Sequence, residues 1–226
     1  MKSVILLGTV MLGLCATSQA ALYNSDFMNG GVIPDANLSG WSDTRNISGL
    51  SGTISAVQVT LNTTGGFNGD LYAYLSFNGT LVPLLTRVGS SESNPFGYSS
   101  SGMVNLVLVD GAPDVHLYGG GALTGTYAPD GRVLDTTTML PGTGVPSTLA
   151  SFNGASPNGD WTLFFADVSS GDQSTVTSWS LDIITAVPEP INVALGVFAG
   201  LFLIGSVCRS ERVRKLFAKP QPVDLD

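Results

Sequence analysis

Hydrophobic and polar residues alternate along much of the chain. Apolar side chains occupy every second position in residues 57–61, 71–75 and 161–165. A period of two places successive side chains on opposite faces of an extended segment, so the pattern predicts β-strands with one buried face. Trp161 and Trp179 share the phase of the buried positions, and we expect both to pack in the core. Further strands are predicted at Thr80–Val88, Val104–Val109 and Thr175–Ile184.

Turn-forming pairs separate these segments. Asn-Gly or Asp-Gly pairs begin at residues 68, 78, 110, 130 and 158. Such residues tolerate the positive φ that tight hairpin turns require. Residues 111–146 are too many and too polar for a hairpin loop, so we expect them to cross the end of the sheets. Short strands at near-regular spacing predict an all-β domain over residues 30–186, an antiparallel jelly roll or β-sandwich.

Two apolar runs lie outside this pattern, one at each end of the chain. Residues 1–20 combine Lys2, an apolar stretch and a small residue at Ala20, which is typical of a signal peptide cleaved after Ala20. Residues 191–207 carry no charge, and at about 1.5 Å per residue they cover roughly 25 Å, the short end of a bilayer span. We therefore expect export across the inner membrane and one C-terminal transmembrane helix.

A basic cluster follows the second apolar run. Its members are Arg209, Arg212, Arg214 and Lys215. Bases that flank a membrane span stay in the cytoplasm, so the domain before the span is expected outside and residues 216–226 form a cytoplasmic tail. A buried core helix is the alternative for the apolar run, but such a helix rarely lacks a polar face.

Pro188, Glu189 and Pro190 stand just before the apolar run. Proline disfavours both helix and sheet, which keeps this segment extended and accessible. The order of Pro-Glu-Pro, apolar helix and basic cluster over residues 187–215 resembles the PEP-CTERM sorting signal of Gram-negative bacteria. That resemblance implies an exosortase, a membrane-embedded transpeptidase-like enzyme, as partner and a link to extracellular polymer. A proline-rich tether without processing is the alternative.

The charge of the exported body is strongly negative. Between residues 21 and 186 the bases are Arg45, Arg87 and Arg132 against thirteen acids, which gives 3 − 13 = −10. A surface of this charge repels phosphate backbones and argues against nucleic acid as a partner. The body contains no cysteine, so a buried core rather than disulfide bonds must stabilise it.

A series of short motifs follows in order along the body. Its members are Ile33-Pro34-Asp35, Gly40-Trp41, Asn68-Gly69-Asp70-Leu71, Asn78-Gly79-Thr80, Phe152-Asn153-Gly154, Asn158-Gly159-Asp160-Trp161, Asp167 and Ser178-Trp179-Ser180-Leu181. Their order and spacing resemble the P domain, or Homo B domain, which follows the catalytic domain in proprotein convertases such as furin and kexin and in many bacterial subtilases. The resemblance implies a jelly roll and an association with subtilisin-like serine proteases.

Three aspartates are candidate ligands for calcium. Asp70 and Asp160 each follow an Asn-Gly pair, and Asp167 ends a predicted strand. Calcium takes several oxygen ligands from carboxylates and carbonyls, so aspartates gathered at an edge of the sandwich could bind it; some P domains carry calcium. The alternative is that these side chains fix turns through hydrogen bonds to the backbone.

The chain shows no pattern of a catalytic site. Its single histidine, His116, lies in the polar stretch 111–146, and no Gly-x-Ser-x-Gly accompanies it. A Ser-His-Asp enzyme needs a base oriented by a carboxylate and a serine on a strained turn. We therefore expect no catalytic residues, and any link to endopeptidase activity would come through the usual companion of the P domain.

Two functions fit these features. The first is a non-catalytic module displayed at the cell envelope, held by the helix or released to the extracellular matrix after processing, that binds or organises extracellular polysaccharide. The second is an accessory P domain that acts with a separately encoded subtilase. The first requires only what the sequence contains, and we prefer it.

The sorting motif predicts the C-terminus of the mature protein. Cleavage near Pro188 would remove the apolar run and the basic cluster, so mass spectrometry of the surface-exposed protein should find a C-terminal peptide that ends close to the Pro-Glu-Pro motif. A variant with Pro188→Ala and Pro190→Ala should keep its original end. Recovery of Asp226 on the wild-type surface protein would indicate simple anchoring instead.

Overall fold

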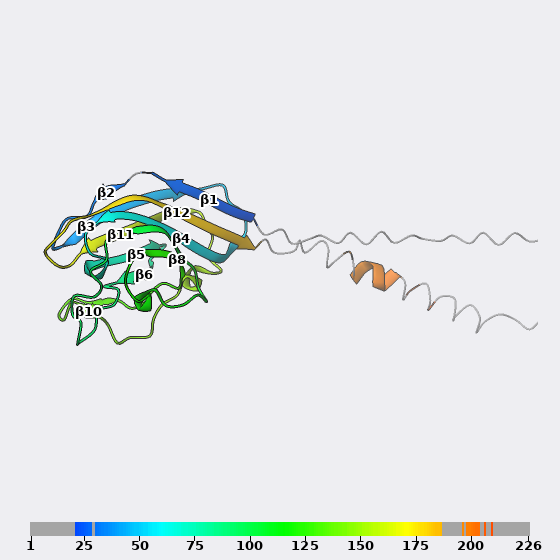
Figure 1. Ribbon diagram of the computed structural model, residues 1–226. Helices are drawn as coiled ribbons and strands as arrows, with labels where there is room; N and C mark the ends of the chain where they lie inside the picture. The colour runs from blue at the N-terminus through cyan, green and yellow to red at the C-terminus, as the bar shows by residue number, and fades with distance from the viewer. Residues whose placement is uncertain are drawn as a thin grey trace, which may run out of the picture. The chain divides into compact units, whose positions relative to one another are not determined.

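The computed structural model describes residues 21–28 and 30–186, and beyond them residues 196, 198–203, 206 and 209. The described residues of the body form one compact unit (Figure 1). The cleavage position Ala20, the Pro188-Glu189-Pro190 motif and the tail 216–226 lie outside the described residues, as do Arg212, Arg214 and Lys215.

The described residues beyond the body are helical, and Arg209 among them is exposed. Across all described residues, no helix combines the length and the apolar character needed to cross a membrane. Much of the apolar run 191–207 falls outside the described residues. The transmembrane helix therefore stays a prediction.

The body is built from β-strands, as the period of two predicts. Its larger sheet has the order β1-β12-β4-β7-β8, with β2 also pairing with β12, and its second sheet has the order β3-β11-β5-β6. The strands are β1 (Ala21–Phe27), β2 (Gly31–Val32), β3 (Asn37–Ile47), β4 (Thr53–Gly65), β5 (Leu71–Phe77), β6 (Thr80–Thr86), β7 (Met103–Leu108), β8 (Leu123–Tyr127), β9 (Leu134–Asp135), β10 (Leu140–Pro141), β11 (Gly159–Asp167) and β12 (Ser174–Ala186). Three short 3-10 helices join them: η1 (Asn68–Asp70), η2 (Val115–Leu117) and η3 (Leu149–Phe152).

The two sheets lie over one another and enclose a single core (Figure 1). Strand β5 alternates strictly, with Leu71, Ala73, Leu75 and Phe77 buried and the residues between them half-buried. Every second side chain of a strand faces the other sheet, so the apolar positions of the alternating pattern form the core. Trp161 and Trp179 are both buried in the core, as predicted, and Trp41 packs half-buried against it. Strand β1 pairs with β12 along its whole length and was not predicted from the sequence.

The polar stretch 111–146 carries structure of its own. It contains η2, the two-stranded sheet of β9 and β10, and β8, which pairs with β7 in parallel. The expectation of a purely antiparallel sandwich is therefore wrong at this one pair. A parallel pair needs a crossover of about a dozen residues, which the chain between Leu108 and Leu123 supplies.

Trp161 lies at the centre of the aromatic part of the core. Its ring stacks on Phe77 with centroids 4.0 Å apart and an interplanar angle of 7°, and it meets Phe152 at 5.2 Å. Its indole N–H donates to the carbonyl of Pro157 at 3.0 Å. The ring thus joins strands β5 and β11 to helix η3.

We expect Trp161→Ala to lower the free energy of unfolding by about 3–5 kcal/mol, because truncation leaves a cavity between two rings. Trp41→Ala removes the same side chain at a half-buried position and serves as the matched control, with a smaller expected loss. Urea unfolding followed by circular dichroism measures both. A loss for Trp161→Ala no larger than that for Trp41→Ala would contradict this account.

Candidate functional site

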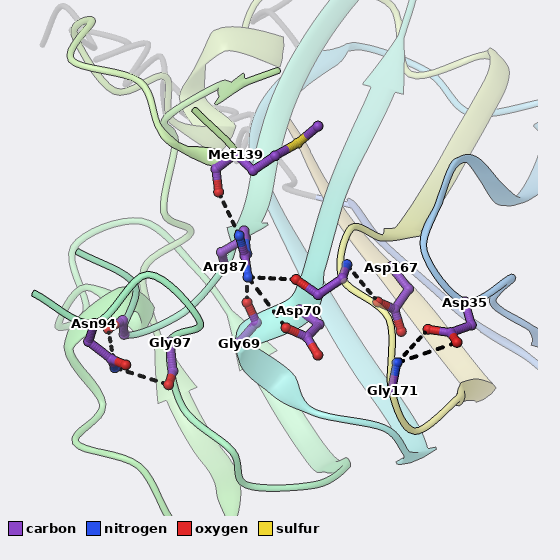
Figure 2. A network of polar contacts seen from close by, with 11 residues as sticks. Asp35, Gly69, Asp70, Arg87, Asn94, Gly97, Met139, Asp167 and Gly171 are labelled. Atoms are coloured by element: carbon purple, nitrogen blue, oxygen red, sulfur yellow. Dashed lines mark hydrogen bonds and ion pairs between the residues drawn. The ribbon is translucent and has the colours of Figure 1, made fainter. Parts of the chain in front are cut away.

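Arg87 holds one end of the sandwich together. It directly follows β6, has a positive φ of 51° and is buried. Its Nε donates to the carbonyl of Gly69 at 3.0 Å, and its Nη1 donates to the carbonyl of Met139 at 2.9 Å. Its Nη2 donates to the hydroxyl of Ser169 at 2.8 Å and to Asp70 Oδ1 at 3.4 Å (Figure 2). One side chain thereby connects η1, the stretch 111–146 and the turn after β11.

The backbone around Asp70 is tightly enclosed. The amides of Asn68 and Gly69 donate to the carbonyls of Ser100 and Tyr98 at 2.8 and 2.9 Å. A Cβ on Gly69 would lie 2.3 Å from the carbonyl oxygen of Phe96, so only glycine fits between η1 and the loop 96–100. This close approach fixes the position of the Asp70 carboxylate.

Two buried carboxyl groups, Asp70 and Asp167, lie at this end of the sandwich, and the charge of Asp70 acts on Asp167. Burial raises the pKa of Asp70, against hydrogen bonds from Ser169 and the charge of Arg87. Burial likewise raises the pKa of Asp167 to about 7, and the negative charges of Asp70 and Asp35 add to the effect. Asp167 Oδ1 accepts the amide of Ser169 at 3.2 Å. Asp167 Oδ2 is buried and has no hydrogen-bond partner among the described residues.

The structure brings together only two of the three candidate calcium ligands. Asp70 and Asp167 interact electrostatically, whereas Asp160 lies at the opposite end of β11. Seven residues of extended strand span about 24 Å, and Asp160 instead accepts a hydrogen bond from Asn46 Nδ2 at 2.7 Å. Within the described residues, no three histidine, cysteine, aspartate or glutamate side chains are grouped so that they could hold a metal ion. Calcium binding stays a prediction, and Asp160 does not belong to a site with the other two.

A cleft of about 200 Å³ opens beside Asp70. Its walls include Phe67, Phe96 and the hydroxyl-bearing residues Ser99, Ser169 and Ser170. Phe96 is 71% exposed, more than any other aromatic residue among the large hydrophobic residues of the described body. The cleft thus combines a buried carboxylate, aromatic surface and hydroxyl groups.

His116 belongs to a second polar network. Its Nδ1 lies 2.9 Å from Asp130 Oδ2, and its Nε2 lies 3.0 Å from the carbonyl oxygen of Ser90. Burial by itself lowers the pKa of His116, but the hydrogen bond and charge of Asp130 outweigh it, so the pKa is raised. Both ring nitrogens thus face protein oxygens, the Asp130 carboxylate on one side and the Ser90 carbonyl on the other.

All three arginines of the described body have carboxylate partners. Arg45 Nε lies 2.8 Å from Asp43, and Arg132 Nε lies 2.5 Å from Asp130. Arg87 pairs with Asp70 at 3.4 Å between two nearly buried side chains. Each of these positive charges is therefore compensated by a carboxylate of the same chain, and the uncompensated charge of the body comes from the remaining acids.

The comparisons with known proteins give a distant structural likeness. No protein-family model matches the chain, and no curated protein is similar to it. Two crystal structures of the serine protease of Aeromonas sobria match, one of them in complex with the chaperone. They are 19% and 20% identical, cover 74% of this chain and 27% of their own, and have TM-scores of 0.42. The chain thus spans about a quarter of the length of those proteases.

Part of this site was predictable from the sequence. Asp70 and Asp167 were predicted as site residues, whereas Arg87 and Phe96 were not. Arg87 carried one usable clue, because it is one of only three bases in a body with thirteen acids and directly follows an apolar strand. Phe96 lies in a stretch of serines with no periodicity, and nothing in the sequence marks it.

We expect the stability of the body to fall as the pH rises toward and through 7. Asp167 titrates at about 7 in the folded state and at about 3.9 in the unfolded chain, so between these values the folded body binds more protons and the free energy of unfolding decreases with pH. The raised pKa of His116 has the same sign: its contribution is complete below about pH 6.5 and is lost as the pH rises through its folded pKa. Urea unfolding at pH 5, 6, 7 and 8 measures the slope.

The variant Asp167→Asn should flatten this dependence, because its amide does not titrate. Asp172→Asn changes the same charge at an exposed position and should leave the slope unchanged. An equal slope in wild type and Asp167→Asn would show that Asp167 titrates alike in both states.

Proposed function

We propose that the body is a non-catalytic binding module displayed at the cell envelope, where it binds or organises extracellular polysaccharide. The observation that carries this proposal is the cleft beside Asp70 on a body of charge −10 whose three arginines are all paired internally. Binding residues on loops held by a rigid β-scaffold are a common arrangement for recognition. The chain's single histidine is buried against Asp130 and the Ser90 carbonyl and does not line the cleft, which supports binding over catalysis there.

Delivery to the envelope is the second part of the proposal. The signal peptide would direct export, and an exosortase would process the chain at Pro188-Glu189-Pro190, upstream of the membrane run 191–207. The order of these parts in the sequence supports this route. The product is either held by its helix or released to the cell surface.

An accessory role beside a separately encoded subtilisin-like protease is the second candidate. It is supported by the ordered motif series over residues 30–186 and by the β-sandwich in which that series folds. In this case the partner would be a protease domain rather than a polymer.

Affinity capture separates these candidates. An epitope-tagged chain expressed in its own host should be recovered from the envelope together with polysaccharide, detected by sugar analysis after washing at moderate salt. The untagged strain is the control for carry-over. Recovery of a subtilase without polysaccharide would overturn the binding proposal in favour of the accessory role, and confinement of the tagged chain to the cytoplasm would contradict both.

A further inference from the structure

The cleft beside Asp70 has the composition of a sugar-binding site. One aromatic residue that lines it, Phe96, is 71% exposed. Asn94 Nδ2 donates to the carbonyls of Gly89 and Gly97 at 3.1 and 3.0 Å, which closes the loop around Phe96 (Figure 2). An apolar ring held out into water is available to stack on the apolar face of a ligand.

Hydroxyl groups line the same cleft. Ser99 and Ser170 are exposed, and Ser169 stands between the cleft and Arg87. Serine hydroxyls both donate and accept, so they match the hydroxyl groups of a pyranose. The volume of about 200 Å³ is suited to one sugar unit rather than to a folded protein segment.

The charge at the floor of the cleft favours a cation. Asp70 makes only a long contact of 3.4 Å with Arg87 and a bond with Ser169, so its carboxylate keeps acceptor sites free. The charge of the exposed Asp35 also acts on Asp70, and the buried Asp167 Oδ2 has no partner among the described residues. A single guanidinium stands against these three carboxyl groups.

We infer that this cleft binds a protonated amino sugar, a glucosamine-type unit of a partly de-N-acetylated polysaccharide. The inference rests on the proposed function and names its ligand. The ammonium group would bind Asp70, the apolar face of the ring would stack on Phe96, and the hydroxyls would bind the serines. A lysine or arginine side chain would satisfy the carboxylate but would leave the exposed Ser99 and Ser170 unused. A polyanionic polymer would meet a repulsive surface.

Isothermal titration of the full chain in detergent with a glucosamine tetrasaccharide tests the inference. We expect saturable binding, and at least about tenfold weaker binding of the fully N-acetylated tetrasaccharide, which has the same ring but no charge. Equal binding of the two sugars would overturn the inference. So would tighter binding of a tetralysine peptide, which would assign the cleft to a basic protein.

Phe96→Ala should weaken binding of the glucosamine tetrasaccharide by at least about fivefold. Leu117→Ala is the matched control, because Leu117 is 72% exposed and does not line the cleft; its affinity should equal that of the wild type. Asp70→Asn removes the charge from the cleft and should also weaken binding, and its melting temperature is recorded alongside. If Asp70→Asn fails to fold, Ser170→Ala removes one hydroxyl of the cleft at an exposed position instead. Unchanged affinity in Phe96→Ala would refute the site.

The two proposals can fail separately. If the native protein still captures polysaccharide while Phe96→Ala captures it equally well, the binding function stands and the assignment of the cleft is wrong. If the purified chain binds the glucosamine tetrasaccharide but no polysaccharide is captured from the envelope, the cleft stands and the envelope function is wrong.

Discussion

A single buried guanidinium determines the arrangement of one end of this sandwich. Arg87 reaches residues 18, 52 and 82 positions away in the chain, namely Gly69, Met139 and Ser169. A buried cation is tolerated only when its donors are satisfied and its charge is compensated. The three loops must therefore close around it together, and leaving its partner Asp70 uncompensated would cost about 3–5 kcal/mol.

The scarcity of positive charge has consequences beyond this pair. The body has three arginines for thirteen acids, and each arginine is bound to a carboxylate of the same chain. None remains to attract an anion, so the electrostatic preference of the surface is set by the acids alone. The same three arginines could serve fold stability or the binding of an anionic partner, and in this structure they pair with carboxylates of the fold.

The alternation of the sequence located strands such as β5 and β11, but it did not reveal β1 or the direction of β8. Burying one face of a strand fixes which residues point inward. Strand β5 follows that rule residue by residue, and β11 follows it from Asp160 to Phe165, after which Ala166 is buried as well. The parallel pairing of β8 with β7 depends on the path of the chain between them, which hydrophobic periodicity does not encode. The separation of Asp160 from Asp167 was, by contrast, readable, because the predicted strand 161–165 already placed them at opposite ends. Arg87 could not be assigned a role because all of its side-chain contacts are distant in sequence.

The cleft is shaped before any ligand arrives. Gly69 permits η1 to press against the loop of Phe96, Asn94 closes that loop, and Arg87 holds the turn that carries Ser169. Ordering loops on binding would reduce affinity, so a site whose loops are already tied to a buried cation binds with less entropic loss. The interaction that stabilises this end of the fold is therefore also the one that preorganises the cleft, which couples any change at Arg87 to both.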